Sequence, residues 1–223
     1  MGMTALVMGA TGLVGRLVTE ELLHRNFMDE VRLLVRRPVD MVHPKLKVIH
    51  TDWDKLQHDK EAFQGVDSVF CCLGTTIRKA GSQEQFRKVD FEYVLTGARL
   101  AKLGEVRQFL AISSMGADPK SKVFYNRVKG EMEEALCGLQ LPGLHLFRPS
   151  LLLGDRNERR FAEGIASVLM TKLDFAFTGR LASIRAIPAA KVARAMVNIS
   201  ITNTRGNHVY PNEVIHVLGE TIA

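Results

Sequence analysis

Cysteine and aromatic residues are scarce in this chain: its 223 residues include three cysteines, one tryptophan and three tyrosines. Adjacent Cys71 and Cys72 would point to opposite faces of a strand, which is poor geometry for a disulfide, and the odd number leaves one thiol over. We therefore expect reduced thiols in a reducing compartment. The seven histidines have no cysteine or histidine partners at metal-ligand spacing, so the sequence predicts no metal site.

Long apolar runs and clusters of one charge are also absent. The longest uncharged runs, such as residues 68–77, fall well short of the ~20 residues that span a bilayer. Residues 1–15 have no basic segment typical of a signal peptide. We therefore expect a cytoplasmic protein without a membrane partner. Lys and Arg number 30 against 24 Asp and Glu, a net charge of +6 without a basic tract. This balance favours polyphosphate ligands over nucleic acid.

The remaining composition is that of a soluble globular protein, with 46% hydrophobic and 24% charged residues, and the length fits a single domain over residues 1–223. Short apolar runs alternate with amphipathic stretches up to Pro149. This alternation predicts an α/β fold, a Rossmann-like doubly wound parallel sheet. Strands are expected at residues 4–8, 31–35, 46–50, 68–73, 108–113 and 144–147, and helices at residues 13–25, 85–102 and 125–136.

The ends of the helices and the C-terminal part add further expectations. Gly104 and Gly138 stand just past predicted helices, where a left-handed residue often ends the helix. Beyond Pro149 the pattern changes to a charged loop at 156–160, a helix at 161–170 and a helix from Pro188 to about residue 201. We expect residues 150–223 to contribute a small cap over the carboxyl ends of the strands, where open parallel sheets bind ligands.

A turn with spaced glycines connects the first predicted strand to the first predicted helix. Gly9 permits the turn, Gly12 lets backbone N–H groups approach a diphosphate, and Gly15 allows the helix and the strand to pack closely. The strand-turn-helix context indicates a dinucleotide site; a turn without a ligand is the alternative. The residues expected to contact the cofactor here are Gly9, Thr11, Gly12, Leu13, Val14 and Gly15.

Two arginines follow the second predicted strand, where a site that prefers NAD would carry a carboxylate for the ribose 2′-hydroxyl. Arg36 and Arg37 suit a 2′-phosphate instead, because charge-assisted hydrogen bonds to phosphate are worth roughly 1.5–3 kcal/mol each. They predict NADP(H) as the cofactor, with NADPH preferred over NADH by at least about tenfold. A solvated basic turn is the alternative.

The ends of the next two predicted strands supply further candidates. Asp52 could border the adenine through a hydrogen bond and Trp53 through ring contact, but Trp53 could equally be an aromatic residue at the edge of the core. Leu73, Gly74 and Thr75 end the fourth strand. Gly74 would let the backbone pass close to the cofactor ribose.

Tyr125 and Lys129 are spaced i, i+4, so on a helix both side chains lie on one face and can converge on one pocket. An ammonium beside a phenol favours the phenolate, which lets a tyrosine exchange a proton at neutral pH. Alone, this spacing would usually be a surface pair. Ser113 and Ser114 close the preceding strand; we expect Ser114 to orient a substrate carbonyl and Ser113 to lie beside the cofactor. The two serines could be exchanged, and local turn capping is the alternative for both.

Together these motifs resemble the atypical short-chain dehydrogenase/reductases, in particular the Tat-interacting-protein type of oxidoreductase and its bacterial relatives. The resemblance rests on Phe70-Cys71-Cys72-Leu73-Gly74-Thr75-Thr76, on Val89-Asp90 with Tyr93-Val94-Leu95, and on Ser113-Ser114 running on to Tyr125 and Lys129-Gly130-Glu131. It implies a Rossmann fold, NADPH binding through the glycine turn and the arginines, and Tyr125 with Lys129 as the active pair. It also suggests Leu152 and Arg160 as cofactor contacts, with Arg156 and Arg159 as alternatives to Arg160.

Three functions are compatible with these residues. The first is a reductase that delivers hydride from NADPH to the carbonyl of a small-molecule substrate, with Tyr125 as the proton donor. The second is a non-catalytic NADPH-binding regulator with a protein-interaction surface. The third uses Cys72 as a thioester-forming nucleophile, although no histidine stands at a recognisable spacing from it. Helical faces within residues 85–102 could also form a homodimer.

Overall fold

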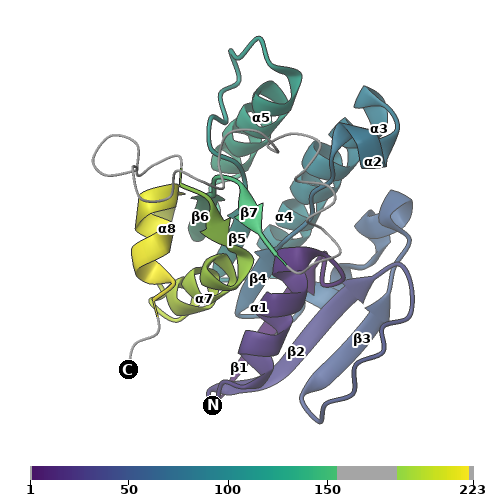
Figure 1. Ribbon diagram of the computed structural model, residues 1–223. Helices are drawn as coiled ribbons and strands as arrows, with labels where there is room; N and C mark the ends of the chain where they lie inside the picture. Colours follow the sequence, from purple (N-terminus) through teal and green to yellow (C-terminus); the bar gives the residue numbers. More distant parts are fainter. Residues whose placement is uncertain (1, 155–184, 221–223) are drawn as a thin grey trace.

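The computed structural model describes residues 2–154 and 185–220. Seven strands of the described chain form one sheet in the order β3-β2-β1-β4-β5-β6-β9, and every neighbouring pair is parallel (Figure 1). Their bounds are β1 Met3–Met8, β2 Met28–Val35, β3 Leu46–His50, β4 Ser68–Cys71, β5 Gln108–Ile112, β6 Gly143–Arg148 and β9 Gly206–Pro211. From the central strand β1, the chain builds the sheet outward through β2 and β3 on one side and through β4, β5, β6 and β9 on the other. This strand order confirms the predicted Rossmann-like α/β sheet.

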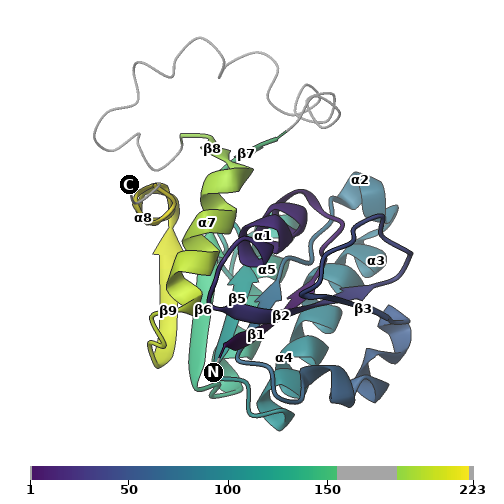
Figure 2. The ribbon, with the colours of Figure 1, turned by 90° about the horizontal axis from the view of Figure 1, so that it is seen from below.

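Helices cover both faces of this sheet. α1 (Leu13–Leu23) and α7 (Ala189–Ser200) lie side by side on one face, and α4 (Tyr93–Leu103) and α5 (Phe124–Gly138) lie on the other (Figures 1 and 2). The strands between them are buried on two sides: residues 5–8 of β1 are fully buried and face the two cores alternately. This double burial explains why the strand is a continuous apolar run in the sequence.

The stretch predicted as one helix at residues 85–102 consists of three segments. α3 (Gln83–Arg87) and α4 are joined by a π-helical turn, η3 (Lys88–Glu92). Asp90, in the middle of this turn, is buried. Hydrophobic periodicity does not reveal such a turn, because the five residues of α3 are too few to define a helical phase that could be compared with that of α4. π turns of this kind are frequent at functional sites.

The other described elements are short. They are the 3₁₀ helices η1 (Trp53–His58) and η2 (Lys60–Phe63), the helices α2 (Ile77–Ala80) and α8 (Asn212–Leu218), and the paired strands β7 (Leu152–Leu153) and β8 (Ile187–Pro188).

The left-handed helix ends expected at Gly104 and Gly138 were wrong. Gly104 has φ −84°, and Gly138 is the last residue of α5. The left-handed residues after these helices are Glu105, with φ 56°, and Gln140, with φ 54°. Gly104 is instead explained by close packing: a side chain does not fit there, because a Cβ would lie 2.8 Å from the carbonyl oxygen of Phe63.

The C-terminal part of the described chain joins the main sheet. The helix expected from Pro188 is α7, whose N-cap is Pro188, whereas β9 is a seventh strand that the sequence did not predict. Residues 187–218 therefore extend the helix and sheet layers, and a cap formed within residues 150–223 stays a prediction. The predicted loop at 156–160 and helix at 161–170 lie outside the described residues.

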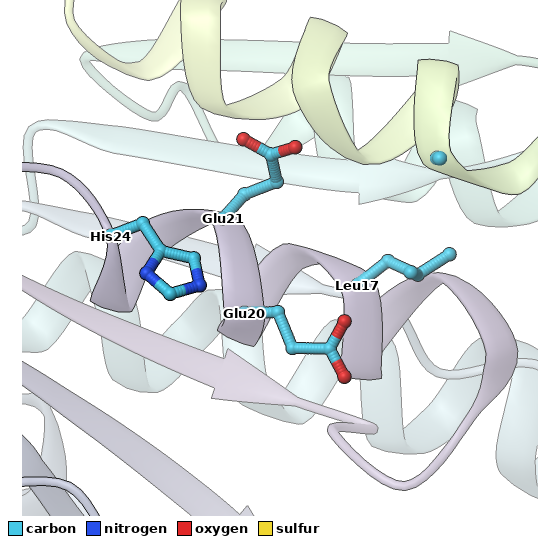
Figure 3. A pocket seen from close by; sticks show the side chains of 5 residues that line it. Leu17, Glu20, Glu21 and His24 are labelled. Carbon is cyan, nitrogen blue, oxygen red and sulfur yellow. The ribbon is translucent and has the colours of Figure 1, made fainter.

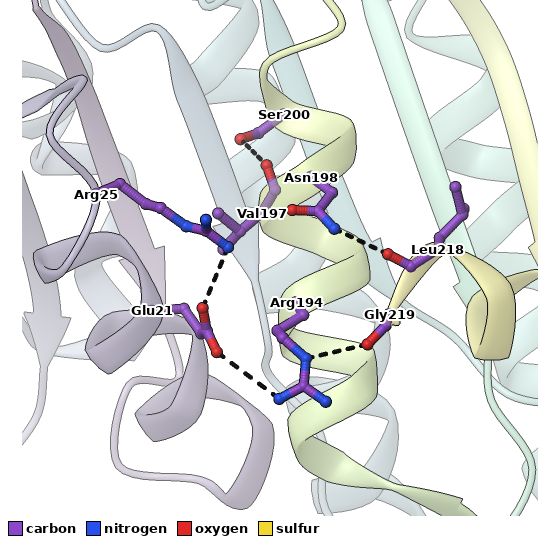
Figure 4. A network of polar contacts seen from close by, with 8 residues as sticks. All are labelled: Glu21, Arg25, Arg194, Val197, Asn198, Ser200, Leu218 and Gly219. Carbon is purple, nitrogen blue, oxygen red and sulfur yellow. Dashed lines mark hydrogen bonds and ion pairs between the residues drawn. The ribbon is translucent and has the colours of Figure 1, made fainter. Parts of the chain in front are cut away.

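A polar network connects α1, α7 and α8 (Figure 4). Arg194 of α7 donates from Nε to the Gly219 carbonyl oxygen at 3.0 Å and approaches the Glu21 carboxylate of α1 at 4.0 Å. Asn198 donates to the Leu218 carbonyl oxygen at 2.9 Å. These bonds satisfy carbonyl groups at the C-terminal end of α8, where helical partners are lacking. They hold α8 against α7, on the face of the sheet that α1 and α7 cover.

Candidate active site

The turn after β1 has a shape that requires glycine at two positions. Gly9 has φ +83°, and a Cβ there would lie 2.7 Å from the carbonyl oxygen of Cys72. A Cβ on Gly15 would lie 2.2 Å from the carbonyl oxygen of Gly9. The chain therefore turns tightly and α1 starts against the turn, as the spacing of the glycines predicts.

The amino-terminal end of α1 suits an anion. Gly12 is its N-cap, and no side chain of the described residues caps this helix. The first N–H groups of a helix, here those of Leu13, Val14 and Gly15, have no partners within the helix, and the helix dipole adds partial positive charge. Thr11 is exposed beside them. These groups fit a diphosphate, as expected for residues 9–15.

Arg36 and Arg37 directly follow β2, the neighbour of β1 in the sheet. Parallel strands end at the same edge, so the two arginines lie along the edge that carries the glycine turn. Both residues are exposed, and neither forms an ion pair with any of the residues described. Their guanidinium groups are therefore available to a phosphate, and recognition of a 2′-phosphate stays a prediction.

Asp52 and Trp53 have structural contacts of their own. The Asp52 carboxylate accepts a hydrogen bond from the Asp54 N–H at 3.1 Å and so caps η1. Trp53 is half-buried and stacks on Tyr93 of α4, with ring centroids 6.0 Å apart. This packing is that of an aromatic at the edge of the core, and contact with adenine stays a prediction for both residues.

Leu73, Gly74 and Thr75 connect β4 to α2. Leu73 is buried in the core beneath α4, Gly74 is exposed, and the Thr75 N–H donates to Asp90 Oδ2 at 2.8 Å. A Cβ on Gly74 would make an ordinary contact, 3.6 Å from Asp90 Oδ1. The packing of the protein itself therefore does not require glycine here, and the approach of a cofactor ribose stays a prediction.

Lys129 is buried against a carboxylate. Its Nζ forms an ion pair with Asp90 Oδ1 at 2.8 Å, with the two side chains only 3% and 1% exposed, and it donates to the Ile112 carbonyl oxygen at 3.4 Å. Burial, the largest single effect, lowers the pKa of Lys129, but the Asp90 carboxylate together with smaller contributions from Tyr125 and Cys71 raises the pKa above its usual value. Lys129 is therefore a charged group at the carboxyl end of β5.

Tyr125 lies one turn before Lys129 on α5, as the i, i+4 spacing predicts. Its half-buried ring packs against Phe86 of α3, with centroids 5.5 Å apart, and Phe86 also contacts Phe124. An ion pair between Arg87 and Glu131 joins the same two helices. The short helix α3 therefore determines where the phenol lies.

Ser113 and Ser114 follow β5 and are 3% and 7% exposed. The hydroxyl of each is buried and forms no hydrogen bond with the residues of the described chain. Local turn capping would require such a bond, so this alternative is disfavoured. The Ile112 carbonyl that Lys129 contacts immediately precedes these serines, which brings the predicted serine, tyrosine and lysine set to one strand end.

The loop after the serines is packed on α5. Gly116 has φ +79°, and the Asp118 N–H donates to the Asn126 carbonyl oxygen at 3.0 Å. A Cβ on Gly130 would lie 2.2 Å from the carbonyl carbon of Asp118. This close approach explains the glycine that follows Lys129, and it holds the serines against the helix that carries Tyr125.

Leu152 and Arg160 were the cofactor contacts suggested by resemblance. Leu152 lies in β7 and is half-buried against the core beneath α1 and α7. A Cβ on Gly154, two residues later, would lie 2.5 Å from Leu13 Cδ1, so the chain after β7 passes close to the glycine turn. Arg160 and its alternatives lie outside the described residues.

Two residues at the site did not come from the sequence reasoning. The sequence analysis names Asp90 only within the motif that carries the family resemblance. It does not predict Phe86 as a site residue. The available signal for Asp90 was an acidic residue in a helical stretch rich in apolar residues, which is unusual for a buried position without a partner. Its partner, Lys129, is 39 positions away in the sequence, so only the packing of α5 on η3 reveals the pair.

The cysteines are free thiols. Burial raises the pKa of Cys72 well above its usual value, and neighbouring Cys71 raises it further. A thiol that stays protonated is a poor nucleophile, which argues against Cys72 as a thioester-forming residue.

A shallow hollow between α1 and α7 lies further along α1, away from the glycine turn (Figure 3). Its volume is about 190 Å³, below the ~300–1,000 Å³ of typical ligand pockets. It is lined by Leu17, Glu20, Glu21, His24 and Ala190. The two glutamate side chains point in different directions, and their charge is unfavourable for a polyphosphate (Figure 3).

Within residues 2–154 and 185–220, no three His, Cys, Asp or Glu side chains are placed to hold a metal ion. Over the same ranges, no helix combines the length and apolar character needed to span a bilayer.

The doubly wound sheet, the glycine turn and the strand-end serines beside a Tyr-Lys pair define an NAD(P)-binding protein of the atypical short-chain dehydrogenase/reductase class. Residues 9–137 match the NAD(P)H-binding family, and the chain belongs to this family. Protein HTATIP2 of Rattus norvegicus is 37% identical over 221 residues, which cover 97% of this chain and 89% of that protein. The predicted resemblance is thereby confirmed.

Two further comparisons extend this result. Protein FMP52, mitochondrial, of Debaryomyces hansenii is 32% identical over 171 residues, 76% of this chain and 74% of the relative. The solved structure of MoeE5 in complex with UDP-glucose and NAD superposes with a TM-score of 0.69 at 16% identity, over 92% of this chain and 74% of that one. At that identity the structural likeness shows the fold alone.

Proposed function

We propose that the protein is an NADPH-dependent reductase that transfers a hydride to the carbonyl group of a small molecule. One arrangement carries the proposal: two buried serine hydroxyls, without hydrogen-bond partners in the described chain, lie at the strand end where Lys129 is anchored. Tyr125 lies one helical turn away. Buried hydroxyls without partners are costly, and a bound carbonyl and ribose would satisfy them.

The chain's own residues account for binding and for proton transfer. A bound dinucleotide supplies the hydride. Ser114 would donate a hydrogen bond to the carbonyl oxygen, Tyr125 would give that oxygen a proton, and Lys129 would hold the ribose. The hydride from the dinucleotide and the proton from Tyr125 would together reduce the carbonyl to an alcohol. A positioned proton donor contributes about 10²- to 10⁴-fold to such a rate.

The preference for NADPH is the part of the proposal that rests on Arg36 and Arg37. Both are exposed at the edge that carries the open end of α1. Two guanidinium groups without carboxylate partners in the described chain favour an anion, and a ribose 2′-phosphate is the group that distinguishes NADPH from NADH.

A non-catalytic NADPH-binding regulator is the second candidate, and one observation favours it. The Lys129 ammonium is paired with the Asp90 carboxylate, so the buried pair has no net charge. A neutral pair provides a weaker positive field for proton transfer than a lone ammonium would.

Tyr125→Phe separates the two candidates. Under the reductase proposal, NADPH affinity is retained while turnover on a responsive carbonyl, followed by loss of NADPH absorbance, falls about 10²-fold or more. Tyr210→Phe, which removes a phenol on β9, is the matched control and should retain turnover. If a panel of aldehydes and ketones shows no turnover, or Tyr125→Phe loses none, the regulator is the better description.

We also propose a cytoplasmic location, which the free thiols support. The relative FMP52 is named mitochondrial, so fractionation of cells is the direct test. A homodimer through α3 and α4 stays a prediction that light scattering of the purified protein would check.

A further inference from the structure

Asn212, the first residue of α8, bonds to two distant segments of the chain. Its side chain is only 2% exposed. Its Oδ1 accepts a hydrogen bond from the Ser150 N–H at 2.9 Å, and its Nδ2 donates to the Arg185 carbonyl oxygen at 2.8 Å. The Ser150 hydroxyl donates to the same carbonyl oxygen. One buried amide therefore joins the start of α8 to the chain after β6 and to the chain before β8.

These two partners require an amide side chain. A backbone N–H can only donate and a backbone carbonyl can only accept, so the group between them must offer one acceptor and one donor. An asparagine at the start of a helix often caps the N–H groups of that helix. Within the described chain, however, α8 has no side-chain cap, and its N-cap is Pro211. Asn212 therefore serves the two distant segments instead of its own helix.

The segment held in this way, residues 149–154, passes between two parts of the candidate site. At one end it bonds to the loop that follows the two serines, because the Pro149 carbonyl oxygen accepts from the Met115 N–H at 2.9 Å. At the other end it approaches the start of α1, because a Cβ on Gly154 would lie 2.5 Å from Leu13 Cδ1. The segment thus connects the serines to the glycine turn along the carboxyl edge of the sheet.

This segment has little support of its own. Its strand β7 pairs with β8 over two residues, and the Ile187 N–H donates to the Leu151 carbonyl oxygen at 2.9 Å. Two strands that pair over so short a length are at best marginally stable by themselves. The helix α8, in contrast, is held at its far end by two hydrogen bonds from α7 (Figure 4). Asn212 extends the support of this helix to residues 149–154.

We propose that Asn212 is a positioning residue that fixes residues 149–154 for the half of the dinucleotide that carries the nicotinamide. This inference rests on the proposed function, and Asn212 acts through the segment that it holds.

The order of the strands gives the reason for choosing this half of the dinucleotide. The diphosphate fits the glycine turn after β1, and the 2′-phosphate of the adenosine half is assigned to Arg36 and Arg37 after β2. The nicotinamide half then extends over β4 and β5, on the opposite side of β1. Residues 149–154 begin at the end of β6, the neighbour of β5 on that side.

The affinities for two probes test the proposal. NADPH contains both halves of the dinucleotide, whereas adenosine 2′,5′-bisphosphate contains only the adenosine half with its phosphates. By titration calorimetry, Asn212→Ala should lower the affinity for NADPH by about tenfold or more, because the loosened segment must be ordered on binding, and should leave the affinity for the bisphosphate within about twofold. Asn198→Ala removes the hydrogen bond to the Leu218 carbonyl oxygen at the other end of α8. This matched control should change neither affinity.

Hydrogen exchange without nucleotide measures the segment by itself. The N–H groups of Ser150 and Ile187 are both hydrogen-bonded in the wild type, and their exchange in Asn212→Ala should be about tenfold faster or more. Amides within β6 should keep their wild-type rates in this variant. Asn198→Ala should leave the exchange of all these groups unchanged.

A milder variant covers the case in which Asn212→Ala does not fold. Ser150→Ala removes only the hydroxyl bond to the Arg185 carbonyl oxygen and leaves the Ser150 N–H on Asn212. It should fold and show the same selective loss of NADPH affinity to a smaller extent.

The two measurements distinguish the possible failures. Equal losses of affinity for the two probes, or no loss for NADPH, overturn the positioning role and leave Asn212 as a structural contact. Unchanged exchange of the Ser150 N–H in Asn212→Ala overturns the role as well. If the wild type does not bind NADPH, the proposed function and the positioning role both fail. In that case faster exchange in Asn212→Ala would still establish that α8 holds residues 149–154.

Discussion

Gly15 lies so close to Gly9 that a Cβ on Gly15 would come within 2.2 Å of the Gly9 carbonyl oxygen. The oxygen belongs to the backbone of a turn that itself has no room to shift, since a Cβ on Gly9 would meet the Cys72 carbonyl oxygen at 2.7 Å. The start of α1, the turn and the end of β4 are thus packed backbone against backbone.

Gly15→Ala should therefore destabilise the protein and weaken nucleotide binding together. Forcing a methyl group into this contact costs about 1–3 kcal/mol, which urea unfolding would measure. Gly138→Ala is the matched control, because a Cβ at that helical position would lie within 4 Å of no described atom beyond its chain neighbours and the adjacent backbone of its own helix. That variant should be neutral or more stable by about 0.5–1 kcal/mol. Equal stability of the two variants would contradict the packing described here.

Replacement of both Arg36 and Arg37 by alanine should weaken the binding of NADPH much more than the binding of NADH. Loss of charge-assisted bonds to one phosphate predicts a selective loss of about tenfold or more. Thermal shifts with each dinucleotide would measure it. Arg205→Ala, an exposed arginine just before β9, should leave the ratio unchanged. Equal losses of NADPH and NADH affinity would remove the assignment of the 2′-phosphate.

Ser114→Ala should lower turnover by about 10²-fold with little change in NADPH affinity, because the hydroxyl is proposed to bond the reacting oxygen. Ser113→Ala should instead weaken the binding of NADPH. Ser68→Ala removes another buried hydroxyl without a partner in the described chain, but at the start of β4, the opposite edge of the sheet. It controls for the loss of a buried hydroxyl as such. The reverse pattern would exchange the roles of the two serines.

His145 should make the stability of the protein fall in mild acid. Burial, with a smaller effect of His208, lowers the pKa of His145 to about 4, and the ring is hydrogen-bonded to the Tyr210 hydroxyl at 2.9 Å and to Gln108. The unfolded chain binds a proton near its usual value of 6.5, whereas the folded chain does not until about 4. The stability that neutral His145 contributes is therefore fully present above pH 6.5. It is lost as the pH falls from 6.5 to about 4, by up to roughly 3 kcal/mol.

Urea unfolding of the wild type and of His145→Gln across this window would measure that loss. The variant should have a flatter pH dependence, whatever its stability at pH 7. His50→Gln, at an exposed histidine that ends β3, should retain the wild-type slope. A wild-type slope in His145→Gln would show that other groups cause the acid sensitivity.

Most of the sheet was predictable because its signals are local. β1 is apolar at every buried position, the glycines directly after it have the spacing of the turn, and the i, i+4 spacing places Tyr125 and Lys129 one turn apart. β9 was missed because Gly206–Pro211 is largely polar, is exposed on an edge of the sheet and ends in proline. It has no long apolar run because its side chains are exposed or half-buried, unlike those of strands that are covered on both faces.

The site was predictable only in part, because its geometry depends on distant residues. The sequence places two serines at the end of β5, but only the fold shows that both hydroxyls are buried without partners in the described chain. Phe86 lies against the ring of Tyr125 because α3 packs on the first turn of α5. The carboxylate next to Lys129 comes from η3, a turn that hydrophobic periodicity does not distinguish from an ordinary helix.

By itself, then, the amino-acid order determined the α/β alternation, the glycine turn and the spacing of the tyrosine and the lysine. Each of these follows from backbone sterics or from side-chain period over a few neighbouring residues. Tertiary structure alone decided that Asp90 is the partner of Lys129 and that the C-terminal part of the chain supplies a seventh strand. Such pairings depend on which surfaces meet when the helices pack on the sheet, and no short stretch of sequence contains that information.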